Sequence, residues 1–481
     1  MREDLSQINP NHLDGADLDT LRAIIVSLMN RVETLEAIVV QQLAEIHHLK
    51  DENARLKGEK GTPSFKANTK KKPTPKSSLK RSAHKRGKPG PDRSACIEID
   101  QRQTVELEQK LPPDARFVGY RDVLVQDLVF TRRTVQYRLK RYYSQQAGRF
   151  YEAVSPAQGH RYGAGLRSFV LMAYYQLRIP QGKILELLRA KGVIISAGAI
   201  SLMLTEQAEA AFSEDYQAIV EAGVATSRHQ HIDHTGLRQD GVGHQVAVLC
   251  TRAYGAFFIN RHRNKDTVRD LLADVLGGSL SDHVAVLVSD KAGEFLAQPV
   301  LHQACWIHEI RHYKQLKGAY FTVFRQEKAA FLEQLYAYYD RLRRWRASPH
   351  EAEAQVLRQE FDVLFSGEGI AFEGLRKRIA LTRASKAELL LCLTDASIPL
   401  ENNEAERSLR EVVLKRKISY GTRSASGSRA WSVMLTLVET ARKQGVEVYG
   451  YLYDRLNGER VMPSLAECIR AQPAQLALAT A

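Results

Sequence analysis

The spacing of apolar positions changes along the chain, and the first segment has the period of a coiled coil. From Leu18 to Leu56, apolar residues recur at alternating spacings of three and four. The two seam positions read Leu18, Ile25, Val32, Val39, Ile46, Asn53 and Leu21, Leu28, Leu35, Gln42, Leu49, Leu56. β-Branched residues at the first position and Leu at the second favour a parallel two-stranded coil. Residues 1–58 are therefore expected to form an oligomerisation helix; the alternatives are an amphipathic helix packed on its own chain and an antiparallel hairpin.

The next patterned segment has the period of strands. Residues 100–150 alternate in the manner of short strands, as in DVLVQDLVFTRRTVQYRLKRYYS, which predicts an antiparallel ribbon. We assign residues 96–160 to a small β-rich module.

From Tyr162 the period becomes helical. Gln181–Ala190 predicts one helix, Gly192 ends it, and Ser196 predicts the N-cap of a second helix over Ala197–Ala208. This spacing fits a helix-turn-helix, so residues 161–225 are a candidate DNA-binding region. A pair of antiparallel helices without DNA-binding function has the same pattern of helix-ending and N-cap residues.

After residue 225, strands and helices are mixed. HQHIDHTGLR predicts a strand with Asp233, QVAVLC and GAFFIN predict a hairpin around Arg252–Gly255, and HVAVLVSD predicts a central buried strand that ends at Asp290. A charge-rich helical stretch covers Phe321–Ser397. NNEAERSL then predicts a helix that carries Glu406. The fold class is therefore α/β, with a core over residues 226–455, a helical insertion at about 315–398 and a C-terminal tail over 456–481.

Charge narrows the choice of partner. The 481 residues have 69 Lys and Arg against 55 Asp and Glu, a formal net charge of +14, which indicates a polyanionic partner. Residues 66–93 hold eight Lys, three Arg and one Asp, a net of 11 − 1 = +10, among Pro and Gly. Residues 59–95 are therefore expected to be a disordered basic linker, with phosphate contact as one role and simple solvation as the other. The candidate phosphate contacts in it are Lys70, Lys71, Lys72, Lys85 and Arg86.

Cysteine usage and hydropathy exclude several classes of protein. The five cysteines are far apart and form no CxxC pair, so a disulfide framework is not expected. No uncharged apolar run approaches the roughly 18 residues that span a bilayer, and the N-terminus lacks an apolar signal core. The expected location is a reducing cytoplasm, with no membrane partner.

Three carboxylates follow one another in a suggestive order: Asp233 on a strand, Asp290 at a strand end and Glu406 on a late helix. Three carboxylates held together can bind two Mg²⁺ ions about 4 Å apart, which suits in-line phosphodiester displacement. Asp at a strand end is also a common turn residue, and Glu406 stands three residues after Asn403 as in a capping box. Spacing alone therefore leaves both interpretations open.

Four motifs together carry a resemblance to a known family. IDHTG, VLVSD, QACWIHEIRH and the long block NNEAERSLREVVLKRKISYGTRSASGSRAWSVMLTLVETARKQGVEVYGYL resemble the large transposase of the insertion sequence sixty-six family (TnpC-type). The resemblance is strongest over residues 232–452. It implies a DDE transposase with an RNase H-like catalytic core and a large helical insertion, preceded by a helical DNA-binding region and an N-terminal coiled coil.

The resemblance also implies roles for individual residues. Asp233, Asp290 and Glu406 take the positions of the family's catalytic, metal-binding acids, and Cys305, Trp306, His308 and Arg311 those of supporting site residues. The basic residues near Glu406 are candidates for DNA contact: Arg407, Arg410, Lys415, Arg416 and Lys417. Two Mg²⁺ ions, replaceable by Mn²⁺, are the implied cofactor. Only Cys96 stands where many family members have a zinc-ribbon Cys set, so a structural zinc is not expected.

The implied activity is metal-dependent 3′-end cleavage and strand transfer at the terminal inverted repeats of an insertion sequence. The implied partners are terminal-repeat and target DNA, a second copy of the chain, and accessory proteins encoded by the same element, in a bacterial cytoplasm beside the nucleoid. A non-catalytic, domesticated DNA-binding protein is the alternative. A remote one is a zinc metalloprotease, because residues 308–312 spell H-E-x-x-H, with Glu309 as base and Glu327 or Glu333 as third ligand.

Overall fold

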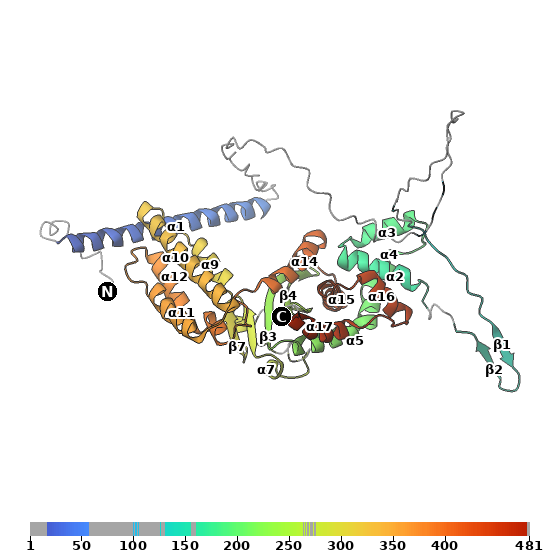
Figure 1. Ribbon diagram of the computed structural model, residues 1–481. Helices are drawn as coiled ribbons and strands as arrows, with labels where there is room; N and C mark the ends of the chain where they lie inside the picture. Colours follow the sequence, from blue (N-terminus) through green and yellow to red (C-terminus); the bar gives the residue numbers. More distant parts are fainter. Residues whose placement is uncertain are drawn as a thin grey trace, which may run out of the picture. The chain divides into compact units, whose positions relative to one another are not determined.

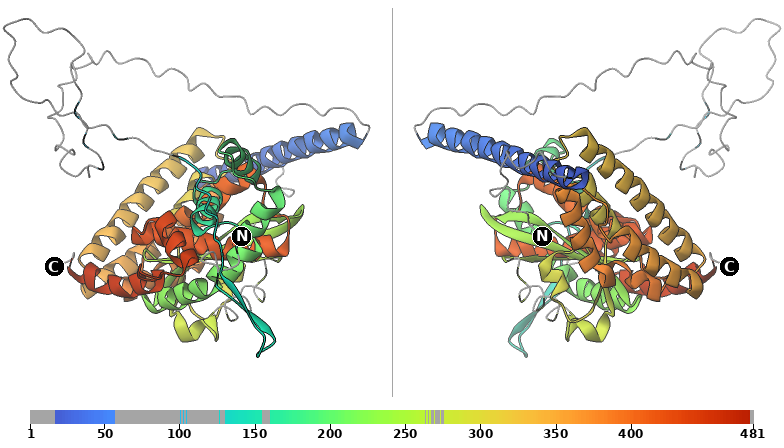
Figure 2. Two further views of the ribbon diagram at one scale, coloured as in Figure 1. Left: turned by 90° about the vertical axis from the view of Figure 1, so that its right-hand side faces the viewer. Right: turned by 90° about the vertical axis from the view of Figure 1, so that its left-hand side faces the viewer.

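The computed structural model of the chain is drawn in Figure 1 and, from two further sides, in Figure 2. It describes residues 17–56, 100, 102, 104, 126, 130–154, 160–262, 264, 266, 269, 273 and 276–478. The chain forms two compact units. One consists of Met1–Glu45 and Thr134–Ala481, and the other of Ile46–Arg133. The predicted linker, with Lys70, Lys71, Lys72, Lys85 and Arg86, lies outside the described residues.

The larger unit contains a five-stranded mixed sheet, with strand order β5-β4-β3-β6-β7. The strands are β3 (His229–Gln239), β4 (Val242–Cys250), β5 (Gly255–Asn260), β6 (Val286–Ser289) and β7 (Leu301–Ala304). The first three form an antiparallel meander, whereas β6 runs parallel to β3 and β7 runs parallel to β6. The predicted hairpin is confirmed, with Cys250 opposite Gly255. All four residues of β6 are buried, as expected of a parallel strand covered on both faces.

Three helices pack on this sheet: α5 (Glu206–Ala225), α14 (Asn403–Ser419) and α15 (Ala425–Gln444). A fourth helix, α17 (Leu465–Leu478), packs on α5 and α15. Helix α14 packs on β3 and β4, and α15 packs on both β5 and α5. Close packing requires Gly223 of α5, because a Cβ there would lie 2.4 Å from the ring of Tyr254. Helix α15 ends at Gly445, whose φ of 67° is left-handed. Residues 456–481 are therefore not only a tail, since Leu465, Ala466 and Ile469 of α17 are buried in the core.

Most of the region before the sheet is helical and shares its hydrophobic core. The elements are α2 (Ala164–Leu171), a π-helix η4 (Met172–Gln176), α3 (Gln181–Ala190) and α4 (Ala197–Leu204). Helix α3 has the predicted bounds, and Ser196 caps α4 by accepting a hydrogen bond from the N–H of Ala199 at 3.1 Å. The predicted end of α4 at Ala208 is wrong. Thr205 leaves helical geometry at φ −121° and ψ −98°, and α5 begins at Glu206.

A second hydrophobic core forms in the helical segment that follows β7. It contains α9 (Trp306–Lys314), α10 (Thr322–Ala347), α11 (Glu351–Leu364), α12 (Glu373–Ala384), α13 (Lys386–Leu389) and the 3₁₀-helix η5 (Leu391–Thr394). These helices gather beside β7 in Figure 1. The long helical stretch predicted between the second and third carboxylates is confirmed.

The N-terminal heptads form one helix, α1 (Leu18–Leu56). Its seam residues Ile25, Leu28, Val32, Leu35, Val39, Ile46 and Leu49 are all exposed. Another face docks on the insertion: the Asn30 amide donates to Ala371 O at 3.0 Å and accepts from Glu373 N–H at 2.8 Å. The carboxylate of Glu33 accepts from the N–H of Phe321 at 3.2 Å. The helix is therefore anchored, and its seam faces solvent.

The remaining short elements are α7 (Leu280–His283), α8 (Gly293–Leu296), α16 (Val448–Asn457) and a hairpin of β1 (Arg141–Ser144) and β2 (Arg149–Glu152). This hairpin is the described part of the ribbon predicted over residues 100–150. Within the described ranges, no helix combines the length and the apolar character needed to cross a membrane.

Candidate active site

Asp233 lies within β3, and Asp290 is the residue that follows the neighbouring parallel strand β6. The register of β3 and β6 pairs His229 with Val286 and His231 with Val288. If the same offset continues for two more residues, Asp233 lies opposite Asp290. β6 ends at Ser289, whereas β3 continues past Asp233 to Gln239, so the two carboxylates are attached level with each other, at the point where the shorter strand ends. Asp233 Oδ1 accepts from the N–H of His234 at 2.7 Å, and Asp290 Oδ1 from the N–H of Ala292 at 3.3 Å.

Glu406 lies in the first turn of α14, the helix that packs on β3 and β4. Its Oε1 is 3.5 Å from His308 Nε2 and 3.7 Å from a terminal nitrogen of Arg311, both on α9. This oxygen is buried, and among the residues that the structure describes it has no hydrogen-bond donor of normal geometry. A buried carboxylate oxygen without a hydrogen bond is suited to accept a cation or a proton.

Asn402 connects the segments that carry the three acids. Its side chain is fully buried; Nδ2 donates to Ile232 O at 2.8 Å, and Oδ1 lies 3.0 Å from His231 Nδ1. Its backbone N–H donates to Cys305 Sγ at 3.2 Å, and its carbonyl accepts from Glu406 N–H at 3.2 Å. In the sequence, Asn402 is only the first residue of the motif NNEAERSL, from which a helix is predicted. Its partners lie far away in the chain, so no local signal could have identified them.

The protonation state of this network follows from burial. Burial lowers the pKa of His231 to about 4, so its imidazole is neutral at pH 7. Since the amide nitrogen of Asn402 donates to Ile232, its oxygen faces His231, and Nδ1 of the imidazole is the nitrogen that carries the proton. Cys305 links Asn402 to the segment of Asp290, because the N–H of Cys305 donates to Ser289 O at 2.9 Å.

The four predicted supporting residues have different surroundings. His308 and Arg311 face Glu406, as described above. Cys305 is buried, which raises the pKa of its thiol, and it reaches the acids only through Asn402 and Ser289. Trp306 points elsewhere: it is fully buried in the insertion core, and its Nε1 donates to Leu389 O at 2.9 Å. Its surroundings are those of a packing residue.

The H-E-x-x-H segment has no zinc-protease geometry. Glu309 is fully buried, with Lys291 Nζ 2.5 Å from its Oε2, and Arg378 and Thr382 hydrogen-bonded to its Oε1. Burial alone would raise the pKa of Glu309, but the charge of Lys291 and these hydrogen bonds outweigh it and lower the pKa. Glu327 accepts from the N–H groups of Ala371 and Phe372. These acids are therefore structural ties, and they are not available to a metal-bound water.

Among the residues that the structure describes, no three His, Cys, Asp or Glu side chains are arranged as a ready metal site. The chemistry of Asp233, Asp290 and Glu406 nevertheless fits Mg²⁺, which prefers carboxylate oxygens. The buried, hydrogen-bond-free Oε1 of Glu406 is the atom that supports this fit.

The basic residues of α14 divide into exposed and buried ones. Arg407, Arg410 and Lys417 are exposed. Arg416 is half-buried and donates to Gly236 O and, at 3.4 Å, to Thr235 Oγ1. Lys415 is only 2% exposed, so the prediction that it contacts DNA is wrong for this structure. Its Nζ donates to Tyr174 O at 2.9 Å and lies 3.3 Å from the centre of the Tyr174 ring.

The burial of Lys415 predicts a pH-dependent effect. Desolvation lowers its pKa in the folded chain to about 7, below the ordinary value of about 10.4. Between these values the unfolded chain binds more protons, so the stability contribution of this group rises with pH. We expect the urea midpoint of Lys415→Met, relative to that of the wild type, to be higher near pH 6 than near about pH 9.5. Lys417→Met, on the exposed face, is the control, and an equal effect of Lys415→Met at both pH values would contradict this account.

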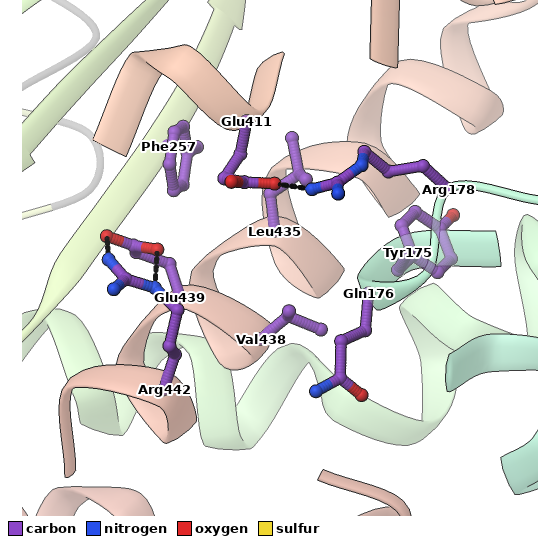
Figure 3. Close-up of a pocket in the computed structure, with 9 residues that line it drawn as sticks. All are labelled: Tyr175, Gln176, Arg178, Phe257, Glu411, Leu435, Val438, Glu439 and Arg442. Atoms are coloured by element: carbon purple, nitrogen blue, oxygen red, sulfur yellow. Dashed lines mark hydrogen bonds and ion pairs between the residues drawn. The ribbon is translucent and has the colours of Figure 1, made fainter. Parts of the chain in front are cut away.

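A small cavity of about 120 Å³ lies elsewhere, and Figure 3 shows the side chains that line it. The lining residues are Tyr175, Gln176, Arg178, Phe257, Glu411, Leu435, Val438, Glu439 and Arg442. Arg178 pairs with Glu411, and Arg442 pairs with Glu439 at 2.7 Å. None of the three candidate acids lines this cavity, and its charges are satisfied internally, so it is not the candidate site.

Comparison with known proteins agrees with the resemblance of the motifs. Residues 159–430 match the family model described as the transposase IS66 family. Three similar proteins of Sinorhizobium fredii have names that give no function: "Uncharacterized protein y4jO" is 34% identical over 209 residues, "Uncharacterized protein y4qI" 35% over 79 and "Uncharacterized protein y4jD" 33% over 88.

These alignments cover 42%, 16% and 18% of this chain, and 64%, 14% and 17% of the respective relatives. The chain thus spans less than two thirds of each of them. No solved structure matches significantly. The family model, however, extends over more than half of the chain, from before α2 to within α15. The chain therefore belongs to the transposase IS66 family.

Proposed function

We propose that this protein is a metal-dependent DNA transposase in which Asp233, Asp290 and Glu406 are the catalytic acids. It cleaves the 3′ ends of its element at terminal inverted repeats and joins them to target DNA. The observation that carries this proposal is the register of β3 and β6, whose offset, continued by two residues, brings Asp233 level with Asp290. The link through Asn402, which ties the helix of the third acid to β3, supports it.

The sheet is, in our proposal, an RNase H-like core. Support comes from the order of its strands, in which the antiparallel meander β3–β5 is followed by the parallel strands β6 and β7. Asp233 lies on β3, and Asp290 follows β6. The helical segment between β7 and α14 is then the insertion that separates the second acid from the third.

Asp233, Asp290 and Glu406 would hold two Mg²⁺ ions, or Mn²⁺ in their place. When bound, such ions supply Lewis-acid activation of the attacking oxygen and stabilisation of the leaving oxygen. The chain's own contribution is orientation. Asn402 holds the start of α14 against β3, and the cationic Arg311 with His308 attracts the Glu406 carboxylate towards α9.

DNA and a second copy of the chain are the partners in this proposal. Arg407, Arg410 and Lys417 expose positive charge on the helix of Glu406, where phosphates near the acids could be contacted. The exposed apolar seam of α1 supports a parallel coiled-coil dimer, since an unpartnered stripe of this length is unfavourable in water. Involvement of accessory proteins from the same element rests on the family alone.

A cleavage assay tests the proposed activity. The full chain would be incubated with a plasmid that carries the native flanking DNA of its gene, with Mg²⁺ or with EDTA. We expect nicks at the repeat boundaries with Mg²⁺ and none with EDTA, because the acids act through the metal. A protein that only binds DNA would retain binding in EDTA and never cut. Absence of cleavage under both conditions, despite DNA binding, would favour that alternative.

Asn402→Ala is expected to lower the cleavage rate by roughly ten- to a hundredfold and to raise the Mg²⁺ concentration needed, because it loosens the support behind Glu406. DNA binding should be unchanged. Asn403→Ala is the matched control, since the neighbouring amide donates only to Glu401 in the described part of the chain. Equal effects of both substitutions on Mg²⁺ dependence would contradict a positioning role for Asn402.

A further inference from the structure

The hairpin of β1 and β2 exposes aromatic side chains on both faces. On one face Tyr143 lies opposite Phe150, with ring centroids 4.8 Å apart, and the guanidinium of Arg141 lies 4.0 Å above the Phe150 ring. On the other face Tyr142 lies opposite Tyr151. These four aromatic side chains are between 44% and 63% exposed.

Such a hairpin is incomplete by itself. An isolated two-stranded ribbon is at best marginally stable in water and needs something to cover it. Within residues 134–154, Ser144 is the one residue that is not fully in the exposed class, so neither face is covered in the described part of the chain. Within the described part of the chain, both faces of the hairpin are therefore open to a binding partner.

The charge of the segment selects the partner. Residues 134–154 contain Arg138, Lys140, Arg141 and Arg149 against Glu152, a net of 4 − 1 = +3. Glu152 pairs with Arg141 at 3.7 Å. For Arg138 and Lys140, no carboxylate partner occurs among the residues that the structure describes. Exposed cations without acids, interleaved with aromatic rings, fit a polyanion better than a neutral protein surface.

We propose that residues 134–152 form a DNA-binding ribbon that lies in the major groove of duplex DNA. A two-stranded ribbon fits the width of that groove. Arg138, Lys140 and Arg149 contact phosphates beside it, while the aromatic faces contact thymine methyl groups and sugars. This inference rests on the proposed function only in taking DNA as the partner.

The test measures binding without catalysis. The full chain, in EDTA, would be titrated against a fluorescent random-sequence duplex of about 30 base pairs and against the matching single strand, at several salt concentrations. The double variant Arg138→Gln, Lys140→Gln precedes β1 and leaves the cross-strand pairs in place. It should weaken duplex binding and reduce the slope of log K against log salt by about 1.8, at about 0.9 per lost phosphate contact.

A second variant, Tyr142→Ala with Tyr151→Ala, should weaken duplex binding without changing the salt slope, because it removes apolar contacts only. The control Arg343→Gln, Arg344→Gln removes the same charge from exposed positions on α10 and should have less effect. Unchanged duplex binding in both variants, an effect no larger than the control, or weakening confined to single strands would each overturn the proposal. Because EDTA abolishes cleavage in every arm, failure here leaves the proposed catalysis untouched.

Discussion

Asp290→Asn is expected to slow Mg²⁺-dependent strand cleavage by at least about a thousandfold while leaving DNA affinity unchanged. Asp290 follows β6, and the offset of β6 against β3, continued by two residues, brings it level with Asp233, so the two carboxylates are attached at adjacent positions of neighbouring strands. An amide binds Mg²⁺ more weakly than a carboxylate, and a bound ion supplies several kcal/mol of charge stabilisation. About 4 kcal/mol corresponds to roughly a thousandfold in rate. The measurement is the single-turnover cleavage rate on DNA that carries the repeat boundaries.

Asp240→Asn provides the matched control for this substitution. Asp240 is exposed in the turn after β3 and has a left-handed φ of 49°, which Asn tolerates well. Its cleavage rate should equal that of the wild type. Cleavage by Asp290→Asn at the wild-type rate would remove this acid from the catalytic site.

Glu309→Ala is expected to destabilise the protein by about 3–5 kcal/mol, because it leaves buried cations without their partner. Glu309 is fully buried on α9, while Lys291 and Arg378 have side chains that are 21% and 14% exposed. Glu309 connects Lys291, the residue after Asp290, to Arg378 of α12. Loss of Glu309 should therefore loosen the contact between the Asp290 segment and the insertion. The measurement is the midpoint of urea unfolding, with Glu333→Ala, at an exposed position of α10, as the control.

The effect of Glu309 should also depend on pH. Its cations lower the pKa of the folded group, so its contribution is present above the ordinary carboxylate pKa and is lost as the pH falls through the folded value. The difference between wild type and Glu309→Ala should therefore shrink in acid. A variant as stable as the wild type at neutral pH would contradict the structural role, and protease activity that needs Glu309 would revive the zinc-enzyme alternative.

Signals within a few residues of one another predicted much of the fold. The run HVAVLVSD predicted a central buried strand because parallel strands covered on both faces lack alternation, and β6 has that burial. Ser196 predicted the start of α4 because its hydroxyl accepts from an N–H three residues on. Both signals are local, so the sequence displays them directly.

Contacts between distant residues could not be predicted in this way. Lys415 has the sequence context of a DNA-contacting lysine, but its partner Tyr174 lies 241 residues earlier. Asn402 and His231 are 171 residues apart, so their hydrogen bond exists only once α14 has packed on β3. Trp306 belongs to a recognised motif, yet its ring is needed by the core of the insertion. In each case long-range packing decided the role.

The most direct test of the central claim counts the metal ions at the three acids. The full chain, bound to uncut duplex that carries the terminal repeat, would be titrated with Mn²⁺ and followed by electron paramagnetic resonance. Our account predicts two bound ions with the spin coupling of a close pair, and loss of that coupling in Asp290→Asn. Binding of Mn²⁺ that is identical in wild type and Asp290→Asn, or no binding to either, would contradict it.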